Sequence, residues 1–178
     1  MGFGLLGRKL GHSYSPQIHK FFGSYDYKLY EREPDELKDF FESGDWNGIN
    51  VTIPYKKDAY RYCSELSPQA EKLGAVNTVI RRKDGTLYGH NTDFFGFDSM
   101  LTRTGLDVYG KKVLILGSGG ASVTAQAVIK EHGGIVVVVS REGENNYKNI
   151  SKHQDAFLIV NATPVGMFPE NGVSPVVL

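Results

Sequence analysis

Residues 113–122 read Val-Leu-Ile-Leu-Gly-Ser-Gly-Gly-Ala-Ser, an apolar run that passes directly into a glycine-rich turn. Apolar residues then recur at helical spacing as far as Ile129, and two further apolar runs follow at 135–139 and 157–160. Unbroken runs of this kind are typical of parallel strands buried on both faces, because a strand with one wet face would alternate. The stretch therefore predicts an α/β fold and the first half of a doubly wound sheet.

The glycine-rich turn suits a nucleotide, because it follows a strand and opens a helix. The backbone amides of Gly117, Gly119 and Gly120 can approach a pyrophosphate there, at the positive end of the helix dipole. Ser122 stands where the usual fingerprint has a third glycine. A turn that serves helix packing alone is therefore the alternative interpretation.

The end of the second apolar run bears on the choice between NAD and NADP. Sheets that bind NAD commonly carry an acidic residue there for the ribose hydroxyls. This chain has Ser140 and Arg141, a hydroxyl and a guanidinium suited to the 2′-phosphate of NADP. Glu142 follows and could pair with Arg141 or accept from a ribose, and Arg141 could instead be a solvated turn residue. The pattern favours NADP.

The first part of the chain has shorter elements in a β-α-β-α order. An apolar strand at 3–7 precedes Ser15-Pro16, where Ser15 can cap a helix that Pro16 begins. Asp84-Gly85 lies between two runs rich in β-formers and predicts a hairpin. A helix over 94–103 closes this part of the chain.

A polar, glycine-punctuated stretch at 105–112 separates the two parts and predicts a domain boundary. We expect an N-terminal α/β domain at 1–104 and a Rossmann-like domain at 105–178. The length of 178 residues is sufficient for two small domains, each with a core.

Composition excludes several classes of function. The 20 Lys and Arg residues balance 20 Asp and Glu residues, so no overall field draws the chain to nucleic acid or anionic lipid. The five histidines show no metal-ligand spacing, and the single cysteine, Cys63, fits a reducing compartment. No apolar run approaches the ~18 residues of a membrane helix. We expect a cytoplasmic protein that binds no metal, membrane or nucleic acid.

Six polar motifs occur at the boundaries of the predicted elements, and their order along the chain is informative. They are Ser13-x-Ser15-Pro16, Asn-Val-Thr-x-Pro-x-Lys at 50–56, Gly-Ala-Val-Asn-Thr at 74–78, Asn-Thr-Asp at 91–93, Gly-x-Gly-Gly-Ala at 117–121 and Asn-Ala-Thr-Pro-x-Gly-Met at 161–167. Together they resemble the shikimate dehydrogenases. The resemblance implies an N-terminal substrate domain, an NADP-binding domain, and reversible reduction of 3-dehydroshikimate to shikimate on the route to chorismate.

The resemblance also implies roles for residues of the substrate domain. Lys56 would deliver a proton to the developing alkoxide, a task that suits an ammonium whose pKa can be tuned by burial. Asp93 would orient Lys56 and accept a substrate hydroxyl. Three hydroxyl side chains would bind the substrate carboxylate and one amide its ring hydroxyls: Ser13, Ser15 and Thr52 for the first task and Asn77 for the second. Taken singly, each of these residues could be a cap, a turn residue or a surface charge.

On the cofactor side, the resemblance adds Ala121 to the glycine-rich turn and places Thr163 and Met167 beside the nicotinamide. The chain departs from the family's common pattern at Lys9 and Lys20, where relatives carry proline and asparagine.

A typical family member is longer, so the resemblance implies a Rossmann-like domain that is truncated at Leu178. A fragment that binds ligands without catalysis is therefore one alternative, and a quinate or shikimate dehydrogenase that uses NAD is another. We expect a monomer or a homodimer.

Overall fold

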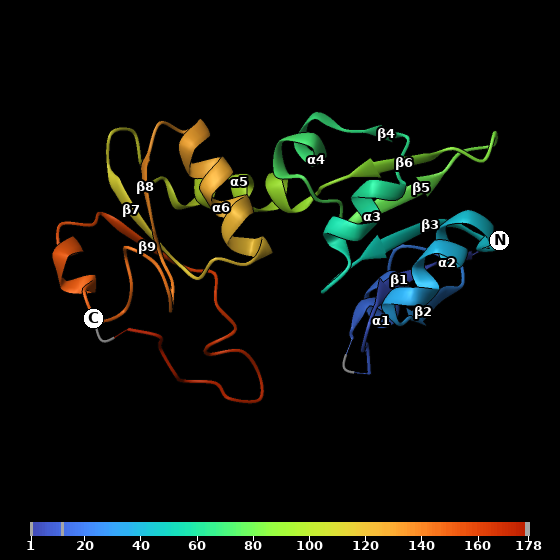
Figure 1. Cartoon of the computed structure of the whole chain (residues 1–178), viewed down its shortest axis with the longest axis horizontal. Helices are drawn as coiled ribbons and strands as arrows, with labels where there is room; N and C mark the ends of the chain where they lie inside the picture. Colours follow the sequence, from blue (N-terminus) through green and yellow to red (C-terminus); the bar gives the residue numbers. More distant parts are fainter. Residues whose placement is uncertain (1, 12, 177–178) are drawn as a thin grey trace. The chain divides into compact units, whose positions relative to one another are not determined.

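The computed structural model describes residues 2–11 and 13–176, and it divides the chain into two compact units. The first unit ends at Thr92 and the second begins at Asp93 (Figure 1). The helix that begins at Asp93 is thus counted with the second unit. The predicted boundary after Thr104, between a substrate domain and a Rossmann-like domain, stays a prediction.

The first unit is built on a six-stranded mixed sheet with the strand order β2-β1-β3-β5-β6-β4 (Figure 1). The strands β1, β2 and β3 pair in parallel, and β5 and β6 form the predicted hairpin. The strands are β1 (Gly2–Gly7), β2 (Tyr27–Glu31), β3 (Trp46–Val51), β4 (Glu65–Leu66), β5 (Thr78–Arg81) and β6 (Leu87–His90). The helices are α1 (Ser15–His19), the 3-10 helix η1 (Pro34–Glu36), α2 (Leu37–Ser43), α3 (Lys56–Tyr62) and α4 (Pro68–Leu73).

The core of the first unit lies where α2 packs on the sheet. Leu37, Phe40 and Phe41 recur at helical spacing on α2 and are all buried, as one apolar stripe requires. Trp46, the first residue of β3, is 1% exposed and stacks on Phe40 with ring centroids 5.6 Å apart. Gly44 ends α2. These aromatic contacts fix the helix against the strand that leads to Asn50 and Thr52.

The ends of the short helices follow local rules, with one correction. Ser67 caps α4, because its hydroxyl accepts the Ala70 N–H at 3.2 Å, and Gly74 ends that helix in the left-handed region at φ 60°. The prediction that Ser15 caps α1 is wrong. Ser15 is the first helical residue, Tyr14 occupies the cap position without a side-chain bond, and the Ser15 N–H donates to the Ser13 hydroxyl at 3.2 Å. Helix α1 therefore begins one residue earlier than expected.

The second unit contains a three-stranded parallel sheet in the order β8-β7-β9. Its elements are α5 (Asp93–Thr104), β7 (Lys112–Leu116), α6 (Gly120–Glu131), β8 (Ile135–Val139), η2 (Ile150–His153) and β9 (Leu158–Asn161). The predicted α/β class and the strand, helix, strand order are confirmed. The central strand β7 is buried from Val113 onward, whereas Ile135 on β8 is 55% exposed. An edge strand has a neighbour on one side only, so its apolar run is less covered than the sequence suggests.

The Cys63 thiol is half-buried and donates to the Ala59 carbonyl at 3.3 Å. Burial raises the pKa of this thiol to about 11.

Across residues 2–11 and 13–176, no helix has both the length and the apolar character that a bilayer crossing requires.

Candidate functional site

A cavity of about 590 Å³ lies at the carboxyl ends of the parallel strands in the second unit. This is where ligands bind in open α/β sheets. Five of the predicted cofactor residues line it, namely Gly117, Gly119, Ser140, Arg141 and Thr163. The remaining three are not among its lining residues: Gly120, Ala121 and Met167. Gly120 and Ala121 are instead the first two residues of α6, and the Met167 side chain is 64% exposed.

The turn between β7 and α6 requires glycine at its first position. Gly117 has φ of 102°, a conformation that L side chains rarely adopt, and a Cβ there would lie 3.0 Å from the Ala162 carbonyl oxygen. The chain after β9 therefore passes close to the turn. Gly119 is the cap residue of α6 and has no side chain, so the amides at the start of this helix are open to a ligand.

The segment that follows β9 is held by Asn161. Its Oδ1 accepts the Thr163 N–H at 3.0 Å and the Thr163 hydroxyl at 2.7 Å, and its Nδ2 donates to the Val165 carbonyl at 3.1 Å. Asn161 is the first residue of the motif at 161–167, but the sequence analysis predicted no role for it. In the structure it holds Thr163 at the cavity, a function that its position at a strand end could have indicated.

The segment after β8 presents Ser140 and Arg141 to the cavity. The Ser140 hydroxyl donates to the Glu142 carbonyl, and the Ser140 N–H donates to the Asn145 carbonyl at 3.2 Å. Arg141 is exposed, so its guanidinium is accessible to an anionic group of a ligand. Tyr147 also lines the cavity. Sequence reasoning missed it, because no motif of the second unit includes it.

The predicted substrate residue Asn77 is buried and forms part of a local network in the first unit. Its Oδ1 accepts the Thr92 N–H at 3.0 Å and the hydroxyls of Thr92 and Thr78, each at 3.2 Å. Its Nδ2 donates to the Thr92 hydroxyl at 2.9 Å. The orientation of this amide is therefore fixed by its neighbours. Ser13, Ser15 and Thr52 are each half-buried.

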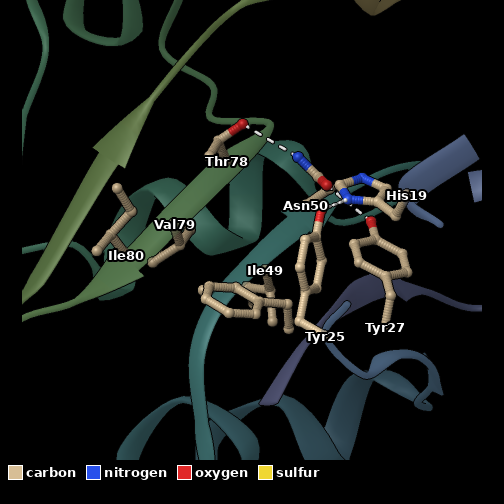
Figure 2. Close-up of a pocket in the computed structure, with 10 residues that line it drawn as sticks. His19, Tyr25, Tyr27, Ile49, Asn50, Thr78, Val79 and Ile80 are labelled. Atoms are coloured by element: carbon tan, nitrogen blue, oxygen red, sulfur yellow. Dashed lines mark hydrogen bonds between the residues drawn. The ribbon is translucent and has the colours of Figure 1, made fainter. Parts of the chain in front are cut away.

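A second cavity, of about 410 Å³, lies on one face of the first unit's sheet (Figure 2). Figure 2 shows aromatic side chains, among them Tyr25 and Tyr27, beside the amide of Asn50. The Tyr27 hydroxyl donates to the Asn50 Oδ1 at 2.7 Å, and the Asn50 Nδ2 donates to the Thr78 hydroxyl at 3.3 Å. Sequence reasoning did not select Asn50 as a site residue. The sequence feature that could have indicated Asn50 is its position as a polar residue within an apolar strand, two positions before Thr52.

The two predicted catalytic residues each begin a helix. Lys56 is the first residue of α3, and its carbonyl accepts the Val76 N–H at 2.9 Å. Asp93 is the first residue of α5. Lys56 belongs to the first unit and Asp93 to the second. Their pairing therefore stays a prediction.

Three comparisons with known proteins agree on one family. The model of the shikimate dehydrogenase substrate binding domain matches residues 5–79. A curated NADP(+) shikimate dehydrogenase of Clostridium beijerinckii is 37% identical, over 98% of this chain and 72% of that protein. The crystal structure of shikimate dehydrogenase 1 from Peptoclostridium difficile is 39% identical, covers 99% of this chain and 73% of its own, and has a TM-score of 0.86. The Thermus thermophilus enzyme, solved in complex with NADP(H) and shikimate, is 30% identical with a TM-score of 0.84, over 99% and 73% of the two chains.

Proposed function

The chain belongs to the shikimate dehydrogenase family, and from this premise we propose that it catalyses the reversible NADP-dependent reduction of 3-dehydroshikimate to shikimate. The observation that carries the proposal is the cavity at the β7–α6 turn, where residues from three strand ends meet. The same sequence supplies, in its first unit, hydroxyl and amide side chains suited to a carboxylated polyol. A protein with both sets can hold a dinucleotide and a small hydroxy acid.

The second unit fits NADP. When bound, NADP supplies or accepts the hydride. The open amides at the start of α6 would receive the pyrophosphate, because the helix dipole favours negative charge at that end. Arg141 would pair with the 2′-phosphate, for which a guanidinium is well shaped. Thr163, held by Asn161, would contact the nicotinamide end.

In the first unit, different side chains would bind different groups of the substrate. The hydroxyls of Ser13, Ser15 and Thr52 would donate to the carboxylate, and the Asn77 amide would bind ring hydroxyls. During reduction the Lys56 ammonium would donate a proton to the carbonyl oxygen as the carbon accepts a hydride. Asp93 would orient Lys56 and accept a substrate hydroxyl. In the reverse direction Lys56 would take up the hydroxyl proton.

The initial rate of NADP reduction with shikimate tests the proposal, with NAD and quinate in parallel assays. We expect turnover with shikimate and NADP, and slower turnover with the other three combinations. Preferred turnover of quinate with NAD would reassign the substrate and the cofactor. Absence of turnover, together with ligand binding detected as a raised Tm, would identify a binding fragment.

Arg141→Ala is expected to raise the KM for NADP by about 10- to 100-fold, because a charge-assisted pair with the 2′-phosphate is lost. The KM for NAD, which lacks that phosphate, should change little. Initial rates at varied cofactor concentration measure both constants. Arg103→Ala, which removes an exposed arginine from α5, serves as the control. An equal effect on both cofactors would contradict the role of Arg141.

We propose further that the protein is cytoplasmic and either a monomer or a homodimer. Light scattering of the purified protein distinguishes the two oligomeric states. Fractionation of the source cells tests the location.

A further inference from the structure

A continuous series of hydrogen bonds joins side chains from three strands of the first unit. It begins at the Tyr27 hydroxyl on β2, which donates to the Asn50 Oδ1 on β3 at 2.7 Å. The Asn50 Nδ2 donates to the Thr78 hydroxyl on β5 at 3.3 Å, and that hydroxyl lies 3.2 Å from the Asn77 Oδ1, to which it donates. Tyr27 is thus joined through two side chains to an amide proposed to bind the substrate.

At the Tyr27 end of the series, the Ser15 side chain of α1 lies near the Tyr27 hydroxyl and acts to lower the pKa of that group. Ser15 is proposed to bind the substrate carboxylate. The Tyr27 hydroxyl therefore donates to Asn50 and lies near Ser15. Ser15 and Asn77 lie far apart in the sequence, and Tyr27 links the elements that carry them.

The phenol ring itself is held in place. The His19 ring stacks on the Tyr27 ring with centroids 3.7 Å apart and an angle of 16° between the planes. The Tyr27 side chain lines the second cavity, as Asn50 and Thr78 do (Figure 2). Burial raises the pKa of Tyr27 to about 12, so the hydroxyl remains a donor across the neutral range. A fixed ring with a permanent donor is suited to orienting an amide.

We propose that Tyr27 is a positioning residue of the substrate site, whose hydroxyl sets the orientation of Asn50 and, through Thr78, that of Asn77. It acts through these side chains and need not touch the substrate. The inference rests on the proposed function, because it concerns how shikimate is held. It accounts for the contact between the Tyr27 phenol group and the Asn50 amide in the lining of this cavity.

The test is the affinity of the purified chain for shikimate, measured by titration calorimetry. Tyr27→Phe removes one oxygen and keeps the ring, so we expect the Kd to rise by about 5- to 20-fold. Tyr30→Phe is the matched control, because it makes the same change on the same strand. Tyr30 packs instead on Phe40, in the core on the opposite face. We expect its Kd for shikimate to equal that of the unaltered chain.

Two further measurements separate positioning from a structural role. In a double-mutant cycle, Ser15→Ala should cost less affinity in the Tyr27→Phe background than alone, because the two side chains are neighbours and their effects are coupled. In initial-rate assays, Tyr27→Phe should raise the KM for shikimate and leave the KM for NADP unchanged. Additive effects of the two substitutions would overturn the coupling.

The outcomes also separate this inference from the proposed function. If the unaltered chain binds shikimate and Tyr27→Phe binds it equally well, Tyr27 has no positioning role and the proposed function stands. A lowered Tm with an unchanged Kd also excludes a positioning role. If the unaltered chain binds no shikimate, the proposed function fails and the inference fails with it.

Discussion

Replacement of Lys56 by Ala is expected to lower kcat for shikimate oxidation by about 10²- to 10⁴-fold, the usual contribution of a positioned acid or base. Without the amine, no side chain in the proposed set exchanges a proton with the reacting oxygen. The Kd for shikimate should change by only a few fold, because the carboxylate and ring hydroxyls would still meet Ser13, Ser15, Thr52 and Asn77. Initial rates and calorimetric titration measure the two quantities separately.

Lys57→Ala is the matched control for this substitution. Lys57 is the next residue of α3 and is exposed, so its removal alters the charge of the helix by the same amount. We expect kcat to stay within about twofold, since exposed charges contribute little. A Lys56→Ala variant as active as the Lys57→Ala variant would remove Lys56 from the mechanism.

Replacement of Trp46 by Ala is expected to lower the free energy of unfolding of the first unit by about 3–5 kcal/mol. The side chain is 1% exposed, and its Nε1 donates to the Phe40 carbonyl at 3.1 Å. The Arg81 guanidinium lies 4.3 Å from the indole ring centre. Truncation would leave a cavity, remove one of the two hydrogen bonds that the Phe40 carbonyl accepts, and leave a cation without its aromatic partner. Because domains are stable by only about 5–15 kcal/mol, the loss is large.

Urea denaturation followed by circular dichroism measures this change. Phe21→Ala is the control, because the Phe21 ring is 90% exposed and its removal opens no cavity. We expect the control to alter the free energy of unfolding by no more than about 0.5 kcal/mol. Equal stability of the two variants would show that the Trp46 contacts do not support the fold.

Most of the fold could be predicted because its signals are local. The run Val113–Leu116 and the glycines after it predict strand, turn and helix without distant information. The helix stripe of Leu37, Phe40 and Phe41 is equally visible. The start of α1 could not be predicted, because Ser15 is itself the first helical residue and donates its N–H to the Ser13 hydroxyl instead of capping the helix. The exposure of Ile135 also required the strand order, since an edge position is a property of the sheet.

The residues of the candidate site could also be predicted from local motifs, whereas their contacts could not. The ordered motifs identify the family and name Lys56, Asp93, Asn77 and the glycine-rich turn, because each motif is a short run of adjacent residues. Asn161 lies within such a motif, yet its three hydrogen bonds to Thr163 and Val165 depend on how the chain turns after β9.

The fold class, the family and the residues that can carry the chemistry are thus readable from residue type and spacing, which are local properties. Which side chains support those residues depends on contacts between distant segments. Three different strands carry Tyr27, Asn50 and Thr78. The first two are 23 positions apart in the sequence, and the last two are 28 positions apart. Their contact depends on strand order and register, which pairing across the whole sheet sets and no short segment encodes.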